Sequence, residues 1–436
     1  MKIAISGEGI NGTGAGLGYF LYHGLQELAL AMPDWHFEIV SSQSFHQLKS
    51  IESGNLRVRF WDDRRFIRIF GSVLGRYLTM SQVDAARQRI SSHIPTQSMK
   101  TACGNLKALW SSLSDLDVIW VPHFLLGAYT RHLSPMVNLG DLGIPLVMTI
   151  HDIHPVFFPN DWPPYSLKRF WEEFVPFATR CAKIITHSNF QKKAIIEHLG
   201  IQADKIDVIA CPPLLNPTDW VNVTTQKGGD EVLERYGIGC PYVFYPGSST
   251  ITHKNHIRLI LAWKEIRNAL GERCPMLVCT SKSPNWAAIH ALIDALDLKD
   301  KVVFTDRVDE RTLAVLYENC MFVAIPTLYE GGGSGPAVEA ILMGKPVLCS
   351  DIPQINEQME NAGCKVTTFD PGSVESISET VINAIENLPE LEVEAAENQR
   401  VLSASFDKAW RHWALEYAER FMLAANQRTS PKPVCQ

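Results

Sequence analysis

The chain has 436 residues, of which 46% are hydrophobic and 20% are charged, and its formal net charge at pH 7 is −7. A single hydrophobic core stops growing at roughly 250–300 residues, so this length predicts two domains in a soluble globular protein. The acidic balance argues against a nucleic-acid-binding protein, which would carry a basic stripe.

The 10 cysteines are scattered and form no Cys-x-x-Cys pair. Because zinc sites need closely spaced pairs, we interpret them as reduced, structural thiols, which suits the cytoplasm. The N-terminus reads as a strand rather than a signal peptide, and no run of about 18 apolar residues is present to span a bilayer. These features predict a cytoplasmic protein.

In the first half, short apolar runs alternate with helical patterns, which predicts βαβ units around a parallel sheet. The predicted strands are Lys2–Ser6, Phe37–Val40, Val118–Val121, Leu146–Ile150, Lys183–His187 and Ile206–Ile209. The helical patterns include Gly18–Ala31 and Phe190–Leu199.

Residues 211–229 are rich in proline, glycine and threonine and indicate a linker, after which the alternation restarts. The predicted strands of the second half are Tyr242–Tyr245, Met276–Cys279, Val302–Thr305, Phe322–Ile325 and Pro346–Cys349. The predicted helices are Asn255–Leu270, Trp286–Leu296, Arg311–Asn319 and Ala337–Met343.

The expected architecture is α/β, with two similar domains facing each other across a cleft. We place the first at 1–215 and the second at 230–405. A last helix at about 407–425 has aromatic residues spaced by three and four, typical of a face packed on a domain, and we expect it to pack back on the first domain.

A glycine-rich segment follows the first strand, with six glycines between positions 7 and 18. Its first part, 7–12, matches Gly-x-Gly-x-x-Gly, but no acidic residue ends the second strand to hold a ribose, so a dinucleotide site is disfavoured. A flexible loop that aims backbone N–H groups at an anion fits better. The alternative is a plain strand-to-helix turn.

His151 and Asp152 follow a predicted buried strand, at the edge where ligands of parallel sheets bind. With His154 they could ligate a metal, but no further ligand cluster stands out, so we predict none. A purely structural histidine is the other interpretation. Asp115 and Asp117 form an Asp-x-Asp directly before a strand, and we expect them to cap it rather than bind a metal diphosphate.

The second half carries the strongest pattern. Lys254 lies near the start of a predicted helix, where a cation beside exposed N–H groups suits a diphosphate. Glu330 and Glu339 flank the glycine-rich segment 331–335, which lets backbone amides approach a ligand. A carboxylate can accept hydrogen bonds from two vicinal hydroxyls, so this pair predicts a clamp for a sugar nucleotide.

With Lys254-Asn255, the two glutamates around their glycine loop and the following Gly-Lys-Pro-Val at 344–347, the sequence resembles the retaining glycosyltransferase family four. The resemblance covers residues 1 to about 425 and is strongest in 242–357. It implies the GT-B fold, with two Rossmann-like domains, an acceptor-binding one first and a nucleotide-sugar-binding one second.

The resemblance also implies roles, metal independence and retention of the donor's α configuration. Catalytic roles fall on His151 beside the donor sugar, Lys254 at the diphosphate and Glu330 at the sugar hydroxyls. Glu339 would hold the ribose. The remaining donor-binding residues are Gly16, Ser248, Arg307, Val308, Gly332, Gly333, Ser334 and Gly335.

The sequence departs from the family at three places. The glutamates are separated by eight residues, Glu-x8-Glu, where seven are usual. Ser248 and His253 stand where many members have arginine, which leaves Lys254 as the firm cation, with Arg307 as a substitute. No carboxylate of the first half lies in an obvious nucleophile context, so we expect same-face attack by the acceptor.

Residues 64–78 read as a basic amphipathic helix, which would lie on an anionic membrane and suit a lipid-linked acceptor. The alternative is a helix packed on the first-domain sheet. The expected function is transfer of a hexose, from GDP-mannose or a UDP-sugar, to a saccharide or glycolipid acceptor in polysaccharide biosynthesis, with no cofactor. The alternatives are a sugar phosphorylase or epimerase, and a non-catalytic nucleotide-sugar-binding protein.

Overall fold

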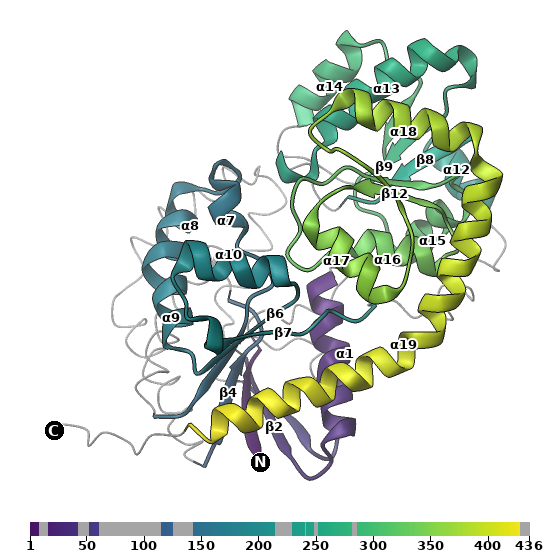
Figure 1. Ribbon diagram of the computed structural model, residues 1–436. Coiled ribbons are helices and arrows are strands. Elements are labelled where there is room, and N and C mark those ends of the chain that lie inside the picture. Colours follow the sequence, from purple (N-terminus) through teal and green to yellow (C-terminus); the bar gives the residue numbers. More distant parts are fainter. Residues whose placement is uncertain are drawn as a thin grey trace. The chain divides into compact units, whose positions relative to one another are not determined.

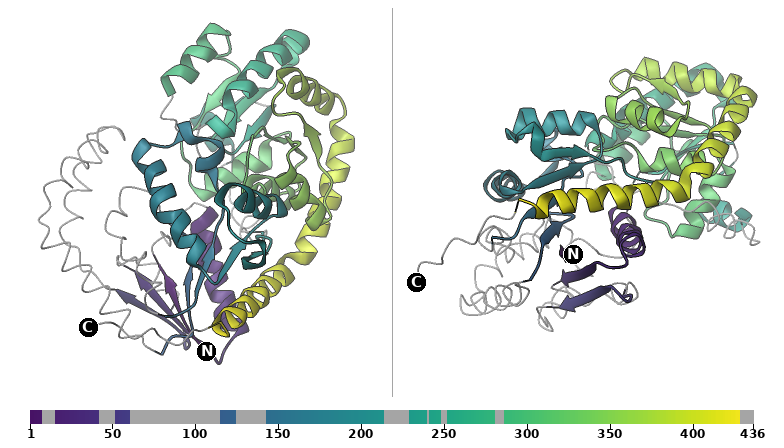
Figure 2. Two further views of the ribbon diagram at one scale, coloured as in Figure 1. Left: turned by 60° about the vertical axis from the view of Figure 1, so that its left-hand side comes forward. Right: turned by 60° about the horizontal axis from the view of Figure 1, so that its bottom comes forward.

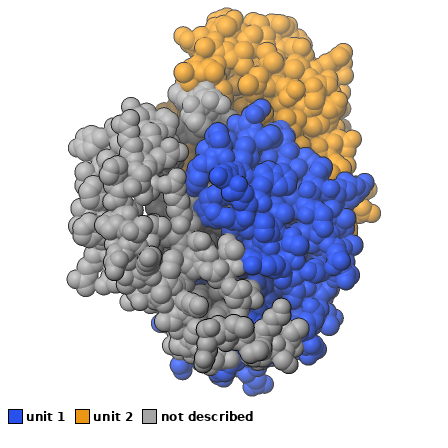
Figure 3. All heavy atoms as spheres, turned by 90° about the vertical axis from the view of Figure 1, so that its left-hand side faces the viewer, with its two compact units in different colours: residues 1–187, 192–209, 410–436 blue, residues 188–191, 210–409 orange. Residues whose placement is uncertain are grey.

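The computed structural model describes residues 1–7, 16–41, 52–60, 115–124, 143–213, 229–239, 241–247, 252–280 and 286–427. The chain divides into two compact units, shown in different colours in Figure 3. Unit 1 comprises residues 1–187, 192–209 and 410–436, and unit 2 comprises 188–191 and 210–409. Within the described part, no helix is long and apolar enough to cross a membrane. The segment 64–78 lies outside the described residues.

Unit 1 is built on seven parallel strands in the order β3-β2-β1-β4-β5-β6-β7. They are β1 (Lys2–Ser6), β2 (His36–Ser41), β3 (Leu56–Phe60), β4 (Val118–Val121), β5 (Leu146–Thr149), β6 (Lys183–Thr186) and β7 (Ile206–Val208). The strands β4 and β5 are buried along their whole length, which explains their continuous apolar sequence. β3 was not predicted, because it lies at the sheet edge and alternates apolar residues with arginines.

The described helices of the first 209 residues are mostly short. They are α1 (Gly16–Ala31), α7 (His154–Phe157), η3 (Pro159–Asp161), α8 (Pro164–Arg169), η4 (Phe170–Phe174), α9 (Val175–Arg180), α10 (Asn189–Leu199) and η5 (Ala203–Lys205). The predicted helices Gly18–Ala31 and Phe190–Leu199 are thus confirmed as α1 and α10, each within two residues.

The long helix α19 (Leu388–Ala425) belongs to unit 2 up to residue 409 and to unit 1 from Trp410 onward. It starts well before the predicted residue 407. Its unit 1 part runs past α1 (Figure 1). It packs an aromatic face on α1 and the sheet: the Trp413 ring lies 5.2 Å from that of Phe20, and the Tyr417 ring 5.4 Å from that of Trp120. The aromatic spacing of three and four therefore marks a buried helix face.

Unit 2 is built on six parallel strands in the order β10-β9-β8-β11-β12-β13. They are β8 (Tyr242–Tyr245), β9 (Met276–Cys279), β10 (Val302–Phe304), β11 (Val323–Ile325), β12 (Val347–Ser350) and β13 (Thr367–Phe369). The first five were predicted. β13 was missed because it is a three-residue edge strand with two threonines in place of an apolar run.

Helices cover both faces of the unit 2 sheet: α13 and α18 lie on one side, and α15, α16 and α17 on the other (Figures 1 and 2). Where the structure describes this unit, its helices are α12 (Gly229–Arg235), η6 (Thr252–Lys254), α13 (His256–Leu270), η7 (Gly271–Arg273), α14 (Trp286–Ala295), α15 (Glu310–Asn319), α16 (Gly335–Leu342), α17 (Pro353–Ala362) and α18 (Val374–Glu386). This layering buries the central strands β8, β11 and β12 and leaves the strand ends as the place where polar loops meet.

Candidate functional site

The unit 2 sheet has a topological switch point between β8 and β11. From β8 the chain winds outward to β9 and β10, and from β11 it winds the other way to β12 and β13. Loops leaving the carboxyl ends of two such strands diverge and open a place for a ligand. The loop after β8 leads to α13, and the loop after β11 leads to α16, so both predicted motifs of this half meet at this point.

Lys254 and Glu330 come together there. The Lys254 Nζ lies 2.6 Å from Oε1 of Glu330, and the two side chains are 18% and 17% exposed. The backbones are joined as well: the Leu328 N–H donates to the His253 carbonyl at 2.7 Å. The Thr327 hydroxyl lies 3.2 Å from the same oxygen and 3.0 Å from the Tyr329 carbonyl. The ion pair therefore sits on two loops that hold each other in place.

Asn255 fixes the position of Lys254 from the other side. It is the N-cap of α13 and has a left-handed backbone with φ 59°. Its side-chain amide donates to the carbonyls of Pro326 and Pro371, both at 2.8 Å. Asparagine tolerates this backbone better than most residues, and its amide ties the start of α13 to the loop after β11.

The glycine-rich loop is shaped by Gln358 of α17. The Ser334 N–H donates to Oε1 of Gln358 at 2.7 Å, while the Ser334 hydroxyl caps α16 by accepting from the N–H of Ala337. Gly333 has φ 103°, and a Cβ at that position would lie 2.3 Å from Cδ of Gln358. Only glycine fits there, so the loop backbone passes closely over α17 before α16 begins at Gly335.

Glu339 lies one turn into α16, as predicted, and its carboxylate is held by Tyr317 of α15. The Tyr317 hydroxyl donates to Oε2 of Glu339 at 2.7 Å. Burial raises the pKa of Glu339 above its ordinary value, and the hydrogen bond from Tyr317 opposes that shift. Burial, and then the charge of Glu339, raise the pKa of Tyr317 well above 10, so the phenol keeps its proton and is the donor.

The remaining predicted donor residues are spread over several loops. Arg307 and Val308 lie between β10 and α15, with an exposed and a half-buried side chain respectively. Gly16 is the first residue of α1 in unit 1. Ser248 lies outside the described residues. Its neighbour Gly247 is described, and a Cβ there would lie 3.3 Å from the His256 ring.

The corresponding edge of unit 1 carries a chain of histidine hydrogen bonds. His151, after β5, places Nε2 at 2.8 Å from the Pro122 carbonyl after β4, and Nδ1 at 2.9 Å from Nε2 of His187 after β6. His187 in turn places Nδ1 at 3.0 Å from the Ile209 carbonyl after β7. The two rings therefore connect the ends of four adjacent strands.

The three hydrogen bonds of the His151 and His187 rings need three protons. A carbonyl can only accept, so each ring donates one N–H to Pro122 or Ile209, and the two nitrogens that face each other need a third proton. Two neutral imidazoles have only two. Burial is the main cause that lowers the pKa of both His151 and His187. The third hydrogen bond thus forms fully only when the pair takes up a proton below its ordinary titration range.

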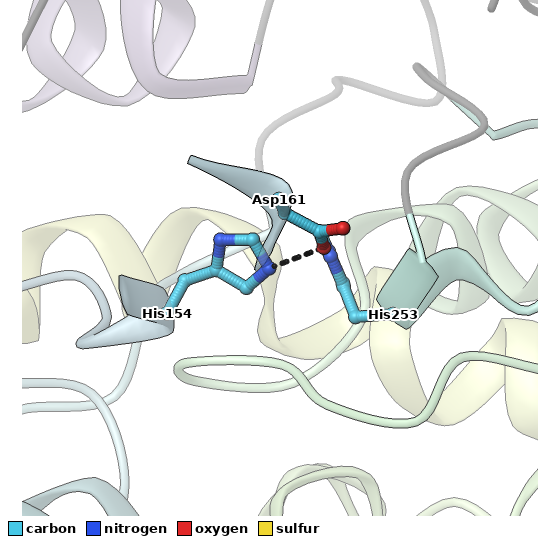
Figure 4. Close-up of side chains that lie close together, drawn as sticks. All are labelled: His154, Asp161 and His253. Atoms are coloured by element: carbon cyan, nitrogen blue, oxygen red, sulfur yellow. Dashed lines mark ion pairs between the residues drawn. The ribbon is translucent and has the colours of Figure 1, made fainter. Parts of the chain in front are cut away.

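The structure does not bring His151, Asp152 and His154 together as a metal site. His151 is committed to the histidine chain, while Oδ1 of Asp152 accepts from the backbone N–H of His154. The His154 ring accepts from the Trp162 indole at 2.6 Å and pairs with Asp161 at 3.2 Å (Figure 4). The three polar side chains therefore serve different partners.

The Asp-x-Asp before β4 also has a structural role, as expected. Asp117 accepts from the backbone N–H of Lys2 at 2.8 Å, and Asp115 pairs with the Lys2 ammonium at 2.7 Å. Both carboxylates thus fasten the start of β1 to the start of β4, at the amino end of the sheet.

Sequence reasoning missed Tyr317 and Gln358. Tyr317 lies on the apolar face of α15, where its ring reads as part of the core. A buried phenol usually has a hydrogen-bond partner, but nothing in the local pattern pointed to Glu339 as that partner. Gln358 lies on an otherwise polar helix surface, so nothing in its local pattern singled it out.

Two family profiles match this chain. The profile described as "Glycosyl transferases group 1" matches residues 241–401, and "Glycosyltransferase Family 4" matches residues 82–212. Among curated proteins, the chain is 27% identical over 261 residues to the O-antigen chain mannosyltransferase RfbU of Salmonella typhimurium, covering 60% of this chain and 65% of that protein. It is 24% identical to the MMP alpha-(1->4)-mannosyltransferase of Mycolicibacterium hassiacum, covering 59% and 60% respectively. The matched region spans less than two thirds of either relative.

Solved structures resemble the chain over nearly its whole length. The Anabaena protein Alr3699/HepE in complex with UDP and glucose has a TM-score of 0.63 and 18% identity, covering 97% of this chain and all of that one. Sucrose-phosphate synthase of Thermosynechococcus elongatus has a TM-score of 0.64 and 14% identity, covering 97% and 98%. These likenesses concern the fold, which is the two-sheet GT-B fold. With the two family profiles, they show that the chain belongs to the family 4, or group 1, glycosyltransferases.

Proposed function

We propose that this protein transfers a hexose from a nucleotide sugar to a saccharide or lipid-linked saccharide acceptor, with retention of configuration and without a metal. The observation that carries the proposal is the Lys254–Glu330 pair at the switch point of unit 2, 2.6 Å apart and beside the glycine-rich loop. A cation, a carboxylate and the backbone amides of a glycine-rich loop are groups that suit a sugar diphosphate.

The geometry suggests how the charge of the leaving group is stabilised. A lysine ammonium has three N–H donors, of which Glu330 takes one, so two remain for the oxygens of the donor diphosphate. Preorganised donors of this kind stabilise charge that develops in the transition state. In this proposal Glu330 accepts hydrogen bonds from the donor sugar, and Glu339 from the ribose. The bulk of Gln358 beneath Gly333 keeps the loop amides in place.

Retention is proposed to follow from attack by the acceptor on the face that the diphosphate leaves. Among the described residues of unit 2, Glu330 is already paired with Lys254 and Glu339 with Tyr317. Neither carboxylate is disposed as a nucleophile, which favours a donor phosphate oxygen as the acceptor of the proton. His151 is proposed to lie beside the donor sugar, as the family resemblance implies.

Mannose is the favoured sugar, because all three curated relatives are named mannosyltransferases, including O-antigen chain mannosyltransferase B of Escherichia coli. We propose GDP-mannose as the donor and an O-antigen-like chain as the acceptor. A UDP-sugar is the second candidate, since one neighbour was solved with UDP-glucose.

The test is thermal unfolding with GDP-mannose and with UDP-glucose, each in the presence of EDTA. A nucleotide sugar at 100 times its Kd adds ~2.7 kcal/mol of stability. We expect a shift with GDP-mannose that Glu339→Ala abolishes, and release of GDP when a mannose-terminated saccharide is added. The same measurements are repeated without EDTA. Absence of any shift under both conditions contradicts the donor site, and a shift without turnover favours a non-catalytic binding protein. A shift that is seen without EDTA and lost with it contradicts metal independence.

A further inference from the structure

Tyr317 has no direct part in the proposed chemistry, yet its hydroxyl is placed on one of the clamp carboxylates. The ring is fully buried between α15 and the sheet, with its edge against Phe244 of β8 at 5.1 Å between centroids. The hydroxyl lies 2.7 Å from Oε2 of Glu339 and 3.4 Å from the carbonyl of Pro336. It has a single proton, and the shorter, charge-assisted bond to the carboxylate takes it.

The hydrogen bond from Tyr317 makes the two carboxylate oxygens of Glu339 different. In the described part of the chain, Oε2 is the oxygen that receives a hydrogen-bond donor. Oε1 lies on the side of Gly335, 4.0 Å from where a Cβ of that residue would be. Because Gly335 has no side chain, no Cβ of that residue stands against this oxygen at the start of α16.

We propose that Tyr317 is a positioning residue for ribose recognition: by holding Oε2 of Glu339, it presents Oε1 to the ribose hydroxyls of the nucleotide donor. This inference rests on the proposed function, in which Glu339 holds the ribose. The benefit is preorganisation, because a glutamate that is already fixed in its bound rotamer loses less conformational freedom when the nucleotide binds. The rigid, buried phenol provides that restraint.

The test compares Tyr317→Phe with the wild-type protein by calorimetric binding of GDP and UDP and of their 2′,3′-dideoxy forms. Wild type should bind one ribonucleotide more tightly than its dideoxy counterpart. Tyr317→Phe should lower the affinity for that ribonucleotide by about 3- to 10-fold, which is the usual contribution of one hydrogen bond. The affinity for the dideoxy form should stay nearly unchanged. The ratio between the two affinities should therefore fall by the same factor.

Tyr242→Phe is the matched control. Tyr242 is equally buried in the same unit, and its hydroxyl donates to the Leu316 carbonyl at 2.8 Å, away from Glu339. The Tyr242→Phe variant should be less stable, because it loses a buried hydrogen bond. Its preference for the ribonucleotide over the dideoxy form should stay at the wild-type value. If Tyr317→Phe weakens both forms equally, its effect is general destabilisation and the positioning role is wrong.

The failure of this inference differs from the failure of the proposed function. If wild type distinguishes ribonucleotide from dideoxynucleotide and Tyr317→Phe keeps the distinction, the donor site stands and the role of Tyr317 is overturned. If wild type binds neither GDP nor UDP, the proposed function itself fails, and the inference falls with it. If wild type binds both forms with one affinity, the ribose role of Glu339 is wrong, and so is the role given to Tyr317.

Discussion

Units 1 and 2 wind their sheets in the same way but place different chemistry at the carboxyl ends of the strands. In each, the first strand lies in the middle, two strands extend to one side and the later strands to the other. In unit 2 this edge carries the Lys254–Glu330 ion pair. In unit 1 it carries His151 and His187, which connect strand ends through imidazole nitrogens.

The difference shows what the fold decides and what it leaves to the loops. Parallel winding brings the loops of neighbouring strands together in both units, whatever their sequence. The residues in those loops then decide whether the edge offers an ion pair that can meet an anion or rings whose hydrogen bonds depend on protons. Unit 2 should therefore respond most to the loss of a charge or of a loop glycine, and unit 1 to acid.

The largest effect should come from Lys254→Ala. Losing one preorganised donor to a developing negative charge costs on the order of 10²–10³ in rate, and Glu330 would also lose its partner. The measurement is kcat for sugar transfer, with the fold monitored by circular dichroism. Lys301→Ala is the control, because Lys301 is also a hydrogen-bonded lysine of unit 2, but it donates to the backbone carbonyl of Cys274 and stands just before β10, at the amino ends of the strands. Equal losses for both variants would contradict a specific role for the pair.

Gly333→Ala tests the glycine-rich loop. A left-handed backbone costs a non-glycine residue about 1–3 kcal/mol, and the new Cβ would meet Gln358 at 2.3 Å. We expect a loss of about 3 kcal/mol in the free energy of unfolding, together with weaker donor binding. Gly363→Ala has a similar positive φ of 66°, but the new Cβ meets only Val401 at 3.7 Å. It should therefore cost less and leave donor binding intact, so a similar result for the two variants would refute the role of Gln358.

Unit 1 should lose stability at acid pH sooner than unit 2, because, among the described residues, it holds more buried histidines with a lowered pKa. Burial lowers the pKa of His123 to about 4, and the negative charge of Asp152 opposes this shift. Burial also lowers the pKa of His151 and His187 in the same unit, where His151 is further lowered by the neighbouring rings and His187 is raised in part by its bond to Ile209 and by Asp152. In unit 2, burial and then Lys254 lower the pKa of His256 to about 3.

A histidine whose folded pKa is depressed contributes stability that is present above the unfolded pKa of about 6.5 and is lost as the pH falls below it. When the pH falls from 7 to 5, protonation linked to His123 and to His256 should each lower the free energy of unfolding by ~2 kcal/mol. Hydrogen exchange at the two pH values should show β4–β6 losing protection before β8–β11. His123→Gln should reduce the loss in unit 1, whereas the exposed His412→Gln should not. Equal loss of protection in both units would contradict the greater acid sensitivity of unit 1.

Much of this fold follows from local sequence. The predicted strands of unit 2 ended within a residue or two of the observed ones, because continuous apolar runs of four are what a doubly covered parallel strand requires. The two missed strands, β3 and β13, lie at sheet edges, where only part of the strand is buried and the apolar run breaks up. The length of α19 was missed because residues 388–406 are mostly polar and bury only isolated residues such as Ala395 and Leu402.

The candidate site was predictable only in part. Lys254, Glu330 and Glu339 stand in a recognisable pattern of charge around glycines, and the structure brings Lys254 and Glu330 together. The groups that hold them could not be predicted, because Tyr317 and Gln358 act across distances of 22 and 24 residues in sequence and lie in helices with ordinary patterns. Ser248, an expected donor ligand, lies outside the described residues, and its role stays a prediction.

The smallest effect concerns unit 1 and the end of α19. Gly24 lies inside α1, where replacing glycine by alanine normally stabilises a helix by about 0.5–1 kcal/mol. Here the new Cβ would lie 2.6 Å from Cη2 of Trp413, whose ring is buried. Overpacking of a core costs about 1–3 kcal/mol, so the net result for Gly24→Ala should be a loss of about 1 kcal/mol, measured by denaturant unfolding. Gly229→Ala, at the start of α12, would meet nothing closer than 3.9 Å and should be neutral or stabilising.

If Gly24→Ala is stabilising as well, the close packing of the Trp413 ring on α1 is contradicted. If it is destabilising and Gly24→Ala combined with Trp413→Phe recovers the loss, the aromatic face of α19 is a specific fit to α1 and not a generic apolar contact.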